Sequence, residues 1–187
     1  MFNEALQFLL KTIVDLFAGA VFLQYFRVPF RNALSEFVVG LTDFAIKPLR
    51  RVIPGIQGLD LASLVFAWGL ESLLVLILLS LQGHSVWTGG PHILPVVILL
   101  GFINLLKYSI YLLIVAVFVQ AILSWVNPYS PITPVLDSIT KPFMRPLRKI
   151  VPTIGRVDLS PLVLFVVCQI ILMLPIAWLE SIALKMV

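Results

Sequence analysis

Four long apolar stretches constrain the fold of this chain more than any other feature of its sequence. They run from about Ala5 to Phe26, Leu61 to Leu81, Ile93 to Val126 and Pro161 to Ser181. A helix needs about 20 apolar residues to cross the hydrocarbon core of a bilayer, and each stretch is long enough. Charged residues make up only 12% of the chain, which is too few for a water-exposed surface. We therefore expect an all-α membrane protein with four transmembrane helices.

The third stretch is longer than one crossing requires. Pro95 and Gly101 lie in its first third, and Lys107 lies near its middle. We interpret residues 107–126 as the crossing, and residues 93–106 as an apolar lead-in that is tilted, kinked or partly interfacial.

The two halves of the chain share a sequence pattern. Leu9-Leu10-Lys11 recurs 96 residues later as Leu105-Leu106-Lys107, and Lys47-Pro48-Leu49-Arg50-Arg51 is matched 98 residues later by Arg145-Pro146-Leu147-Arg148-Lys149. This pattern predicts two repeats, residues 1–90 and 91–187, each built as a helix, a basic loop and a second helix. Because each half has an even number of crossings, the two repeats are expected to be parallel.

The basic residues predict the orientation in the membrane. Ten of the thirteen Lys and Arg residues lie in the two loops that follow the first and third apolar stretches. Cytoplasmic loops are enriched in Lys and Arg, so we expect both basic loops in the cytoplasm and both termini outside.

Each basic loop contains an amphipathic segment that we expect to lie in the membrane interface. The apolar positions are Leu34, Phe37, Val38, Leu41 and Phe44 or Ala45 in the first loop, and Val135, Leu136, Ile139 and Met144 in the second. Thr42 and Asp43 are assigned to the polar side of the first segment. Pro48 and Pro146 are expected to end the two helices.

The basic residues that follow these segments are the leading candidates for a binding site. One interpretation is that they fix the topology and bind anionic lipid headgroups. The other is that both loops form one cytoplasmic platform for a protein partner, such as a membrane complex. Nucleic acid is disfavoured because the loops lack aromatic stacking platforms and are less basic than most nucleic-acid-binding arms. The candidates are Lys47, Arg50, Arg51, Arg145, Arg148 and Lys149.

An aspartate precedes the second helix of each half. Asp60 and Asp158 suit the positive end of a helix dipole, and Ser160 before Pro161 is typical of an N-cap. Alternatively, each aspartate pairs with a nearby arginine, Arg50 or Arg51 in the first half and Arg148 in the second. The two roles are compatible.

Ionisable residues inside the apolar stretches are the third group of candidates. Lys11, Lys107 and Glu180 lie toward the outer ends of their helices, whereas Asp15 and Glu71 are expected near mid-membrane. Lys11 and Asp15, four residues apart, can neutralise each other. In that case Glu71 is protonated, or it hydrogen-bonds to a neighbour and helps to hold helices together. Alternatively, Asp15 and Glu71 face each other and bind a proton or a cation.

The sequence shows no catalytic constellation, no cofactor motif and no metal-ligand cluster, since His84 and His92 lack neighbouring Cys, Asp or Glu residues. We therefore expect a protein that is not an enzyme and binds no cofactor or metal.

The doubled loop motif resembles the YggT family. Pro48-Leu49-Arg50-Arg51 is followed by Pro54 and by Asp60-Leu61-Ala62-Ser63, and the second half has the fuller Asp158-Leu159-Ser160-Pro161. The resemblance covers essentially the whole chain and implies a multi-pass protein of the bacterial cytoplasmic membrane. Relatives have been tied to osmotic or ionic stress tolerance, to membrane organisation around division and to the assembly of membrane cytochrome complexes. No enzymatic activity defines the family.

Three functional hypotheses follow. The first is a non-enzymatic scaffold or assembly factor that uses the duplicated basic platform, either alone or as a homo-oligomer. The second is a small channel or transporter for an ion or osmolyte, based on Asp15 and Glu71. The third is anionic-lipid binding as the function in itself.

Overall fold

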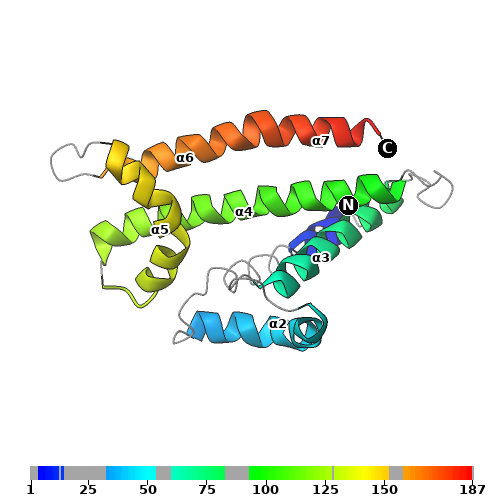
Figure 1. Ribbon diagram of the computed structural model, residues 1–187, viewed down its shortest axis with the longest axis horizontal. Helices are drawn as coiled ribbons and strands as arrows, with labels where there is room; N and C mark the ends of the chain where they lie inside the picture. Colours follow the sequence, from blue (N-terminus) through cyan, green and yellow to red (C-terminus); the bar gives the residue numbers. More distant parts are fainter. Residues whose placement is uncertain are drawn as a thin grey trace.

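The computed structural model describes residues 4–12, 14, 33–53, 60–82, 93–127, 129–151 and 158–186. These residues are helical apart from short turns and contain no strand, in agreement with the predicted fold class. Figure 1 shows the helices α2 (Ala33–Val52), α3 (Leu61–Leu81), α4 (Ile93–Val126), α5 (Thr133–Ile150), α6 (Ser160–Ile171) and α7 (Ala177–Leu184). A π-helical turn, η1 (Leu172–Ile176), joins α6 to α7.

Three helices among the described residues, not the predicted four, are long and apolar enough to cross a membrane. They cover Leu61–Leu81, Ile93–Ser124 and Ser160–Leu184. The last of these is the continuous rod of α6, η1 and α7 (Figure 1). The predicted first crossing, from Ala5 to Phe26, lies mostly outside the described residues. Its described part, together with the adjoining residue 4, comprises residues 4–12 and 14, which are helical.

The apolar lead-in before Lys107 is neither a kinked nor a separate segment, because α4 is a single helix of 34 residues. Pro95 lies in its first turn, where a missing N–H removes no intrahelical hydrogen bond. At about 1.5 Å per residue, α4 is roughly 51 Å long, whereas the hydrocarbon core is about 30 Å thick. Even at a tilt of about 40°, part of α4 would extend beyond the hydrocarbon core, so both a tilted helix and a partly interfacial lead-in fit its length.

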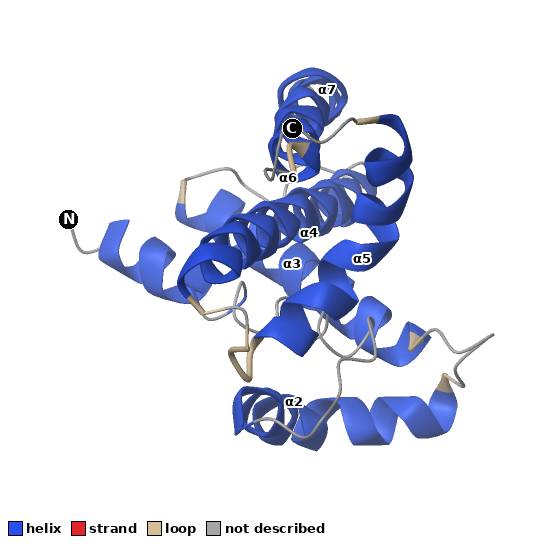
Figure 2. Ribbon diagram, turned by 90° about the vertical axis from the view of Figure 1, so that its left-hand side faces the viewer, coloured by secondary structure: helices blue, strands red, loops and turns tan. Residues whose placement is uncertain are grey.

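Helix α4 contacts α3, α5, α6, η1 and α7, whereas α2 packs against α3. The N-terminal half of α4 packs against α3, where Val75 and Leu79 cluster with Val96 and Val97. Its C-terminal half packs against α5 and α6 through a second cluster. This cluster contains Leu113, Ala116, Val117, Val135, Leu136, Ile139, Met144, Leu164 and Cys168. Figure 2 shows α3, α5 and the α6–α7 rod arranged around α4.

The closest approach of α3 to α4 occurs at Gly101. A Cβ atom added there would lie 2.7 Å from both the backbone N and the Cα of Ser72, and it would also collide with the Ser72 hydroxyl. A real Cβ cannot occupy that space, so only glycine permits this crossing. Small residues serve the same purpose at helix contacts in membranes generally.

The prolines in the amphipathic segments do not end their helices, contrary to our expectation. Helix α2 continues past Pro48 to Val52, and α5 continues past Pro146 to Ile150. A proline inside a helix removes one hydrogen bond and bends the helix, but it does not always stop it. Figures 1 and 2 show α2 changing direction along its length. The last turn of each helix carries Arg50 or Arg148, whose ion pairs hold that turn in place.

Helix α5 buries the four apolar positions of the second amphipathic segment, Val135, Leu136, Ile139 and Met144, together with Thr140. The four apolar residues pack against α4 and α6 as well as belonging to an amphipathic segment. Helix α2 differs from the prediction, because Thr42 and Ile46 are fully buried whereas Phe44 is 74% exposed. Thr42 and Ile46 match Thr140 and Met144 at the offset of 98 residues, so the repeat locates the buried side better than hydrophobicity does. The side chains of Leu34, Phe37, Val38, Leu41 and Ala45 lie outside the described part of the chain.

Candidate functional site

Asp60 joins the end of α2 to the start of α3. One of its carboxylate oxygens accepts a hydrogen bond from the Ser63 N–H at 3.3 Å, and the other accepts one from the Ser63 hydroxyl at 2.6 Å. The Arg50 guanidinium donates to the same carboxylate, with Nε 3.0 Å from Oδ2. Asp60 therefore caps α3 and binds the last turn of α2 at the same time.

Asp158 makes the corresponding contacts in the second half. Arg148 Nε lies 2.9 Å from Asp158 Oδ2, and the Ser160 N–H donates to Asp158 Oδ1 at 2.9 Å. The pair is again ten residues apart, as for Arg50 and Asp60. Ser160 is not the N-cap that we expected. It is the first residue of α6, Leu159 is the cap, and the Ser160 side chain is fully buried. The carboxylate of Asp158 accepts the backbone hydrogen bond instead.

The two aspartates have lowered pKa values. Burial raises the pKa of Asp60, but hydrogen bonds from Arg50 and Ser63 outweigh it and leave the pKa below the ordinary value of 3.8. Burial likewise raises the pKa of Asp158, and hydrogen bonds from Ser160 and Arg148 outweigh it there too. Both groups are therefore carboxylates at neutral pH.

These contacts predict how stability depends on pH. A carboxylate with a lowered pKa stabilises the fold above its unfolded-state value, and this contribution is lost as the pH falls through the folded-state value. We expect the unfolding temperature of the detergent-solubilised protein to drop below about pH 4, near the unfolded-state pKa of aspartate. The control is the double variant Asp60→Asn and Asp158→Asn, which should show a smaller drop over the same range. An identical drop in both proteins would assign the pH dependence to other groups.

The arginines of these pairs are positioning residues rather than free binding groups. Lys47 is also paired, with Asp43 at 2.8 Å, four residues earlier on α2. Four other basic residues, Arg51, Lys141, Arg145 and Lys149, have exposed side chains. Among the described residues, no salt bridge joins these four to an acidic group.

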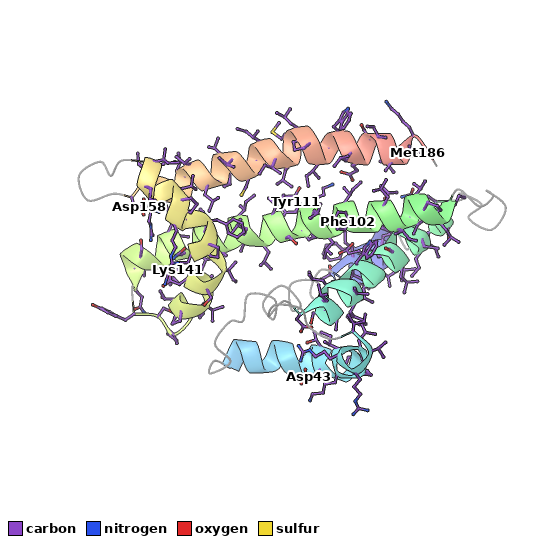
Figure 3. All side chains as sticks on the ribbon, in the orientation of Figure 1. Asp43, Phe102, Tyr111, Lys141, Asp158 and Met186 are labelled. Carbon is purple, nitrogen blue, oxygen red and sulfur yellow. The ribbon has the colours of Figure 1, made fainter. Side chains whose placement is uncertain are left out.

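Three of these free cations form a stripe along α5, which we call the α5 cationic face: Lys141, Arg145 and Lys149. Their spacing of four residues places them on one side of the helix, opposite the buried side around Leu136 and Ile139. Lys141 was not among the sequence-predicted candidates, although the four-residue spacing would have identified it. Figure 3 shows Lys141 and Asp158 at one end of the molecule and Met186 at the other.

A polar contact that the sequence did not reveal fixes α5 against α4. The Thr140 hydroxyl donates to Gln120 Oε1 at 2.7 Å, and Gln120 Nε2 donates to Asp137 Oδ1 at 2.5 Å. Thr42, the match of Thr140, is also fully buried. Gln24, the match of Gln120, lies outside the described residues.

The structure adds contacts for the predicted membrane charges, whose depth in a membrane stays a prediction. Glu71 is fully buried in α3, and Asp15 lies outside the described residues, so the two predicted pairings of Asp15 are not described. Lys11 lies over the ring of Tyr108, with Nζ 5.8 Å from the ring centroid. Lys107 binds Glu180 of α7, with Nζ 2.7 Å from Oε2, rather than extending alone to the interface. In the sequence, the only indication of the Lys107–Glu180 contact was that both residues were expected toward the outer ends of their helices.

A comparison with protein families gives a match over most of the chain. The CCB3/YggT family model matches residues 3–82 and, separately, residues 99–179. This chain belongs to the CCB3/YggT family. The resemblance seen in the doubled motif is thus confirmed, and each matched segment of this family member contains one Arg–Asp pair.

Individual relatives of this CCB3/YggT chain are bacterial. An uncharacterized protein in the proC 3' region of Vibrio alginolyticus is 38% identical over 173 residues, which cover 89% of this chain and 90% of the relative. The uncharacterized protein YggT of Escherichia coli is 34% identical over 173 residues, 90% and 87% of the two chains. An uncharacterized protein of Pseudomonas aeruginosa is 35% identical over 180 residues, 93% and 89% of the two chains. No solved structure matches this chain significantly.

Proposed function

We propose that this protein is a non-enzymatic scaffold or assembly factor of the bacterial cytoplasmic membrane, which binds an acidic partner protein through its basic helices. In this proposal the two matched halves are parallel repeats, the basic helices face the cytoplasm and both termini lie outside. Three apolar helices long enough to span a bilayer support a multi-pass protein. The bacterial relatives support a bacterial protein.

The α5 cationic face is the observation that carries this proposal. Lys141, Arg145 and Lys149 are exposed on one side of α5, while its opposite side is packed into the core formed with α4 and α6. Their charges are not neutralised by any salt bridge within the described residues. They are therefore available to an acidic surface, and they attract it over a distance of about 8–10 Å in physiological salt.

The contacts that hold α5 against α4 and α6 support a docking role as well. Gln120 of α4 binds both Thr140 and Asp137, and the Arg148–Asp158 pair ties the end of α5 to the start of α6. These contacts hold the cationic face in a fixed position before a partner arrives. A preorganised surface loses less conformational entropy on binding than a flexible basic loop would.

Neutralising the α5 cationic face should release the partner without unfolding the protein. The test variant carries Lys141→Gln, Arg145→Gln and Lys149→Gln, and the control carries Lys141→Arg, Arg145→Lys and Lys149→Arg, which keeps the charge. Proteins that co-purify from native membranes in mild detergent are quantified by mass spectrometry. We expect the partner to be retained by the wild type and the control and lost from the test variant.

Unfolding temperatures of all three proteins establish that the fold is intact. Recovery of the same co-purifying proteins with the wild type, the control and the test variant would refute the docking proposal. If only bound phosphatidylglycerol or cardiolipin falls, and no protein partner changes, the surface binds lipid headgroups rather than a scaffolded protein.

A further inference from the structure

The inner side of the last membrane helix follows an unusual spacing. The buried residues of α6 and η1 occur every four positions: Ser160, Leu164, Cys168, Leu172 and Ile176. The next position in this series is Glu180, which binds Lys107. In α7, Ala183 is buried as well. In an α-helix a step of four residues turns by about 400°, or 40° more than a full turn. Five such steps from Ser160 to Glu180 would add roughly 200° and place the two residues on opposite sides.

The π-helical turn η1 removes much of this rotation. The Ala177 N–H donates to the carbonyl of Leu172, five residues earlier, which is the hydrogen bond that defines a π-helix. Pro175 lies inside the turn, and because it lacks an N–H it cannot make the α-helical hydrogen bond to Ile171. One extra residue accommodated in this way turns the following helix back by about 100°. The rotation that remains between Ser160 and Glu180 is about 100°, which is about the width of the buried side of a helix.

The charges show what this change of rotation achieves. Lys107 lies inside the apolar span of α4, and Glu180 lies inside the apolar span formed by α6, η1 and α7. Both side chains are less than one-third exposed, at 28% and 29%. An isolated charge in such a span is unfavourable, so the meeting of these two groups stabilises the contact between the two helices. Without the π-helical turn, Glu180 would point about 100° away from α4 and toward lipid.

We propose that η1 is a register device that presents Glu180 to Lys107, so that the π-helical turn and the ion pair together fix the rotation of α7 against α4. π-helical turns of this kind occur frequently at functional sites. The device acts on the half of the rod beyond Ile176. The packing of α6 against α4 and α5, through Leu164 and Cys168, does not depend on it.

Cross-linking between two introduced cysteines tests this device directly. Lys107→Cys and Glu180→Cys are combined with Cys168→Ala, which removes the chain's single native cysteine. A short bis-methanethiosulfonate reagent is applied to native membranes. In one variant Leu174 is deleted, which converts η1 to α-helix and leaves Glu180 facing Lys107. In the other, one alanine is inserted after Leu174. Because η1 cannot accommodate a second extra residue, the cysteine that replaces Glu180 is rotated by about 100° about the helix axis, away from position 107.

We expect cross-linking to persist after the deletion and to fall to background after the insertion. A second pair, native Cys168 with Leu113→Cys, reports the α4–α6 contact upstream of η1 and should cross-link in both length variants. Loss of the upstream cross-link would show that the insertion unfolds the bundle. The deletion variant, compared with its own upstream cross-link, then decides the test. Equal cross-linking of positions 107 and 180 after insertion, or its loss after deletion with the upstream cross-link intact, would overturn the proposal.

Discussion

We expect the substitution Gly101→Leu to separate α3 from α4 and to lower the stability of the protein by about 2 kcal/mol. The space for a Cβ at this position is already occupied by the backbone of Ser72, 2.7 Å away at both N and Cα. Backbone atoms cannot be displaced as the end of a flexible side chain can. Overpacking of this kind costs roughly 3 kcal/mol, which exceeds the gain of about 1 kcal/mol from replacing glycine in a helix.

The matched control is Gly69→Ala on α3, where an added Cβ meets nothing within 4 Å. This substitution should change the stability by no more than about 1 kcal/mol, because only helix propensity changes. Thermal unfolding in detergent, followed by circular dichroism, compares the two variants with the wild type. Similar unfolding temperatures for Gly101→Leu and Gly69→Ala would show that the close crossing of α3 and α4 is not essential.

The second large effect concerns the Lys107–Glu180 ion pair. Replacing either residue by leucine leaves the other as an unpaired charge inside an apolar span. Insertion scales place the cost of such a charge at about 2.5–3.5 kcal/mol near the membrane centre, so each single variant should be destabilised by roughly 2–3 kcal/mol. The double variant Lys107→Leu and Glu180→Leu should recover most of this loss, because a paired charge and a well-packed apolar pair are often equally stable.

The four proteins form a double-mutant cycle, in which the non-additive part measures the coupling between the two charges. Stability is measured as above, and wild type, both single variants and the double variant are compared in one detergent. Additive losses in the double variant would mean that the two side chains do not interact in the folded protein. The substitution Lys11→Leu provides a further control, since Lys11 contacts Tyr108 and not Glu180.

Contacts between residues close in the sequence were the easiest to predict. Arg50 and Asp60 are ten residues apart, as are Arg148 and Asp158. Because the loop between them is short, the end of one helix and the start of the next must lie close together. The inner side of α5 followed directly from helical periodicity. Phe44 and Thr42 show where that argument fails, because the aromatic residue is 74% exposed and the threonine is fully buried.

The sequence by itself determined the class of the protein, its membrane-length helices, the doubled basic motif and the family to which it belongs. These features depend on composition and on local spacing along the chain. They therefore do not depend on how one helix packs against another. Only the tertiary structure decided that residues 93–126 form one helix, that Gly101 is the point of closest approach, and that Lys107 meets Glu180. The reason is physical. A pair separated by 73 residues depends on the rotation of two helices about their axes, and a single residue in η1 changes that rotation by about 100°.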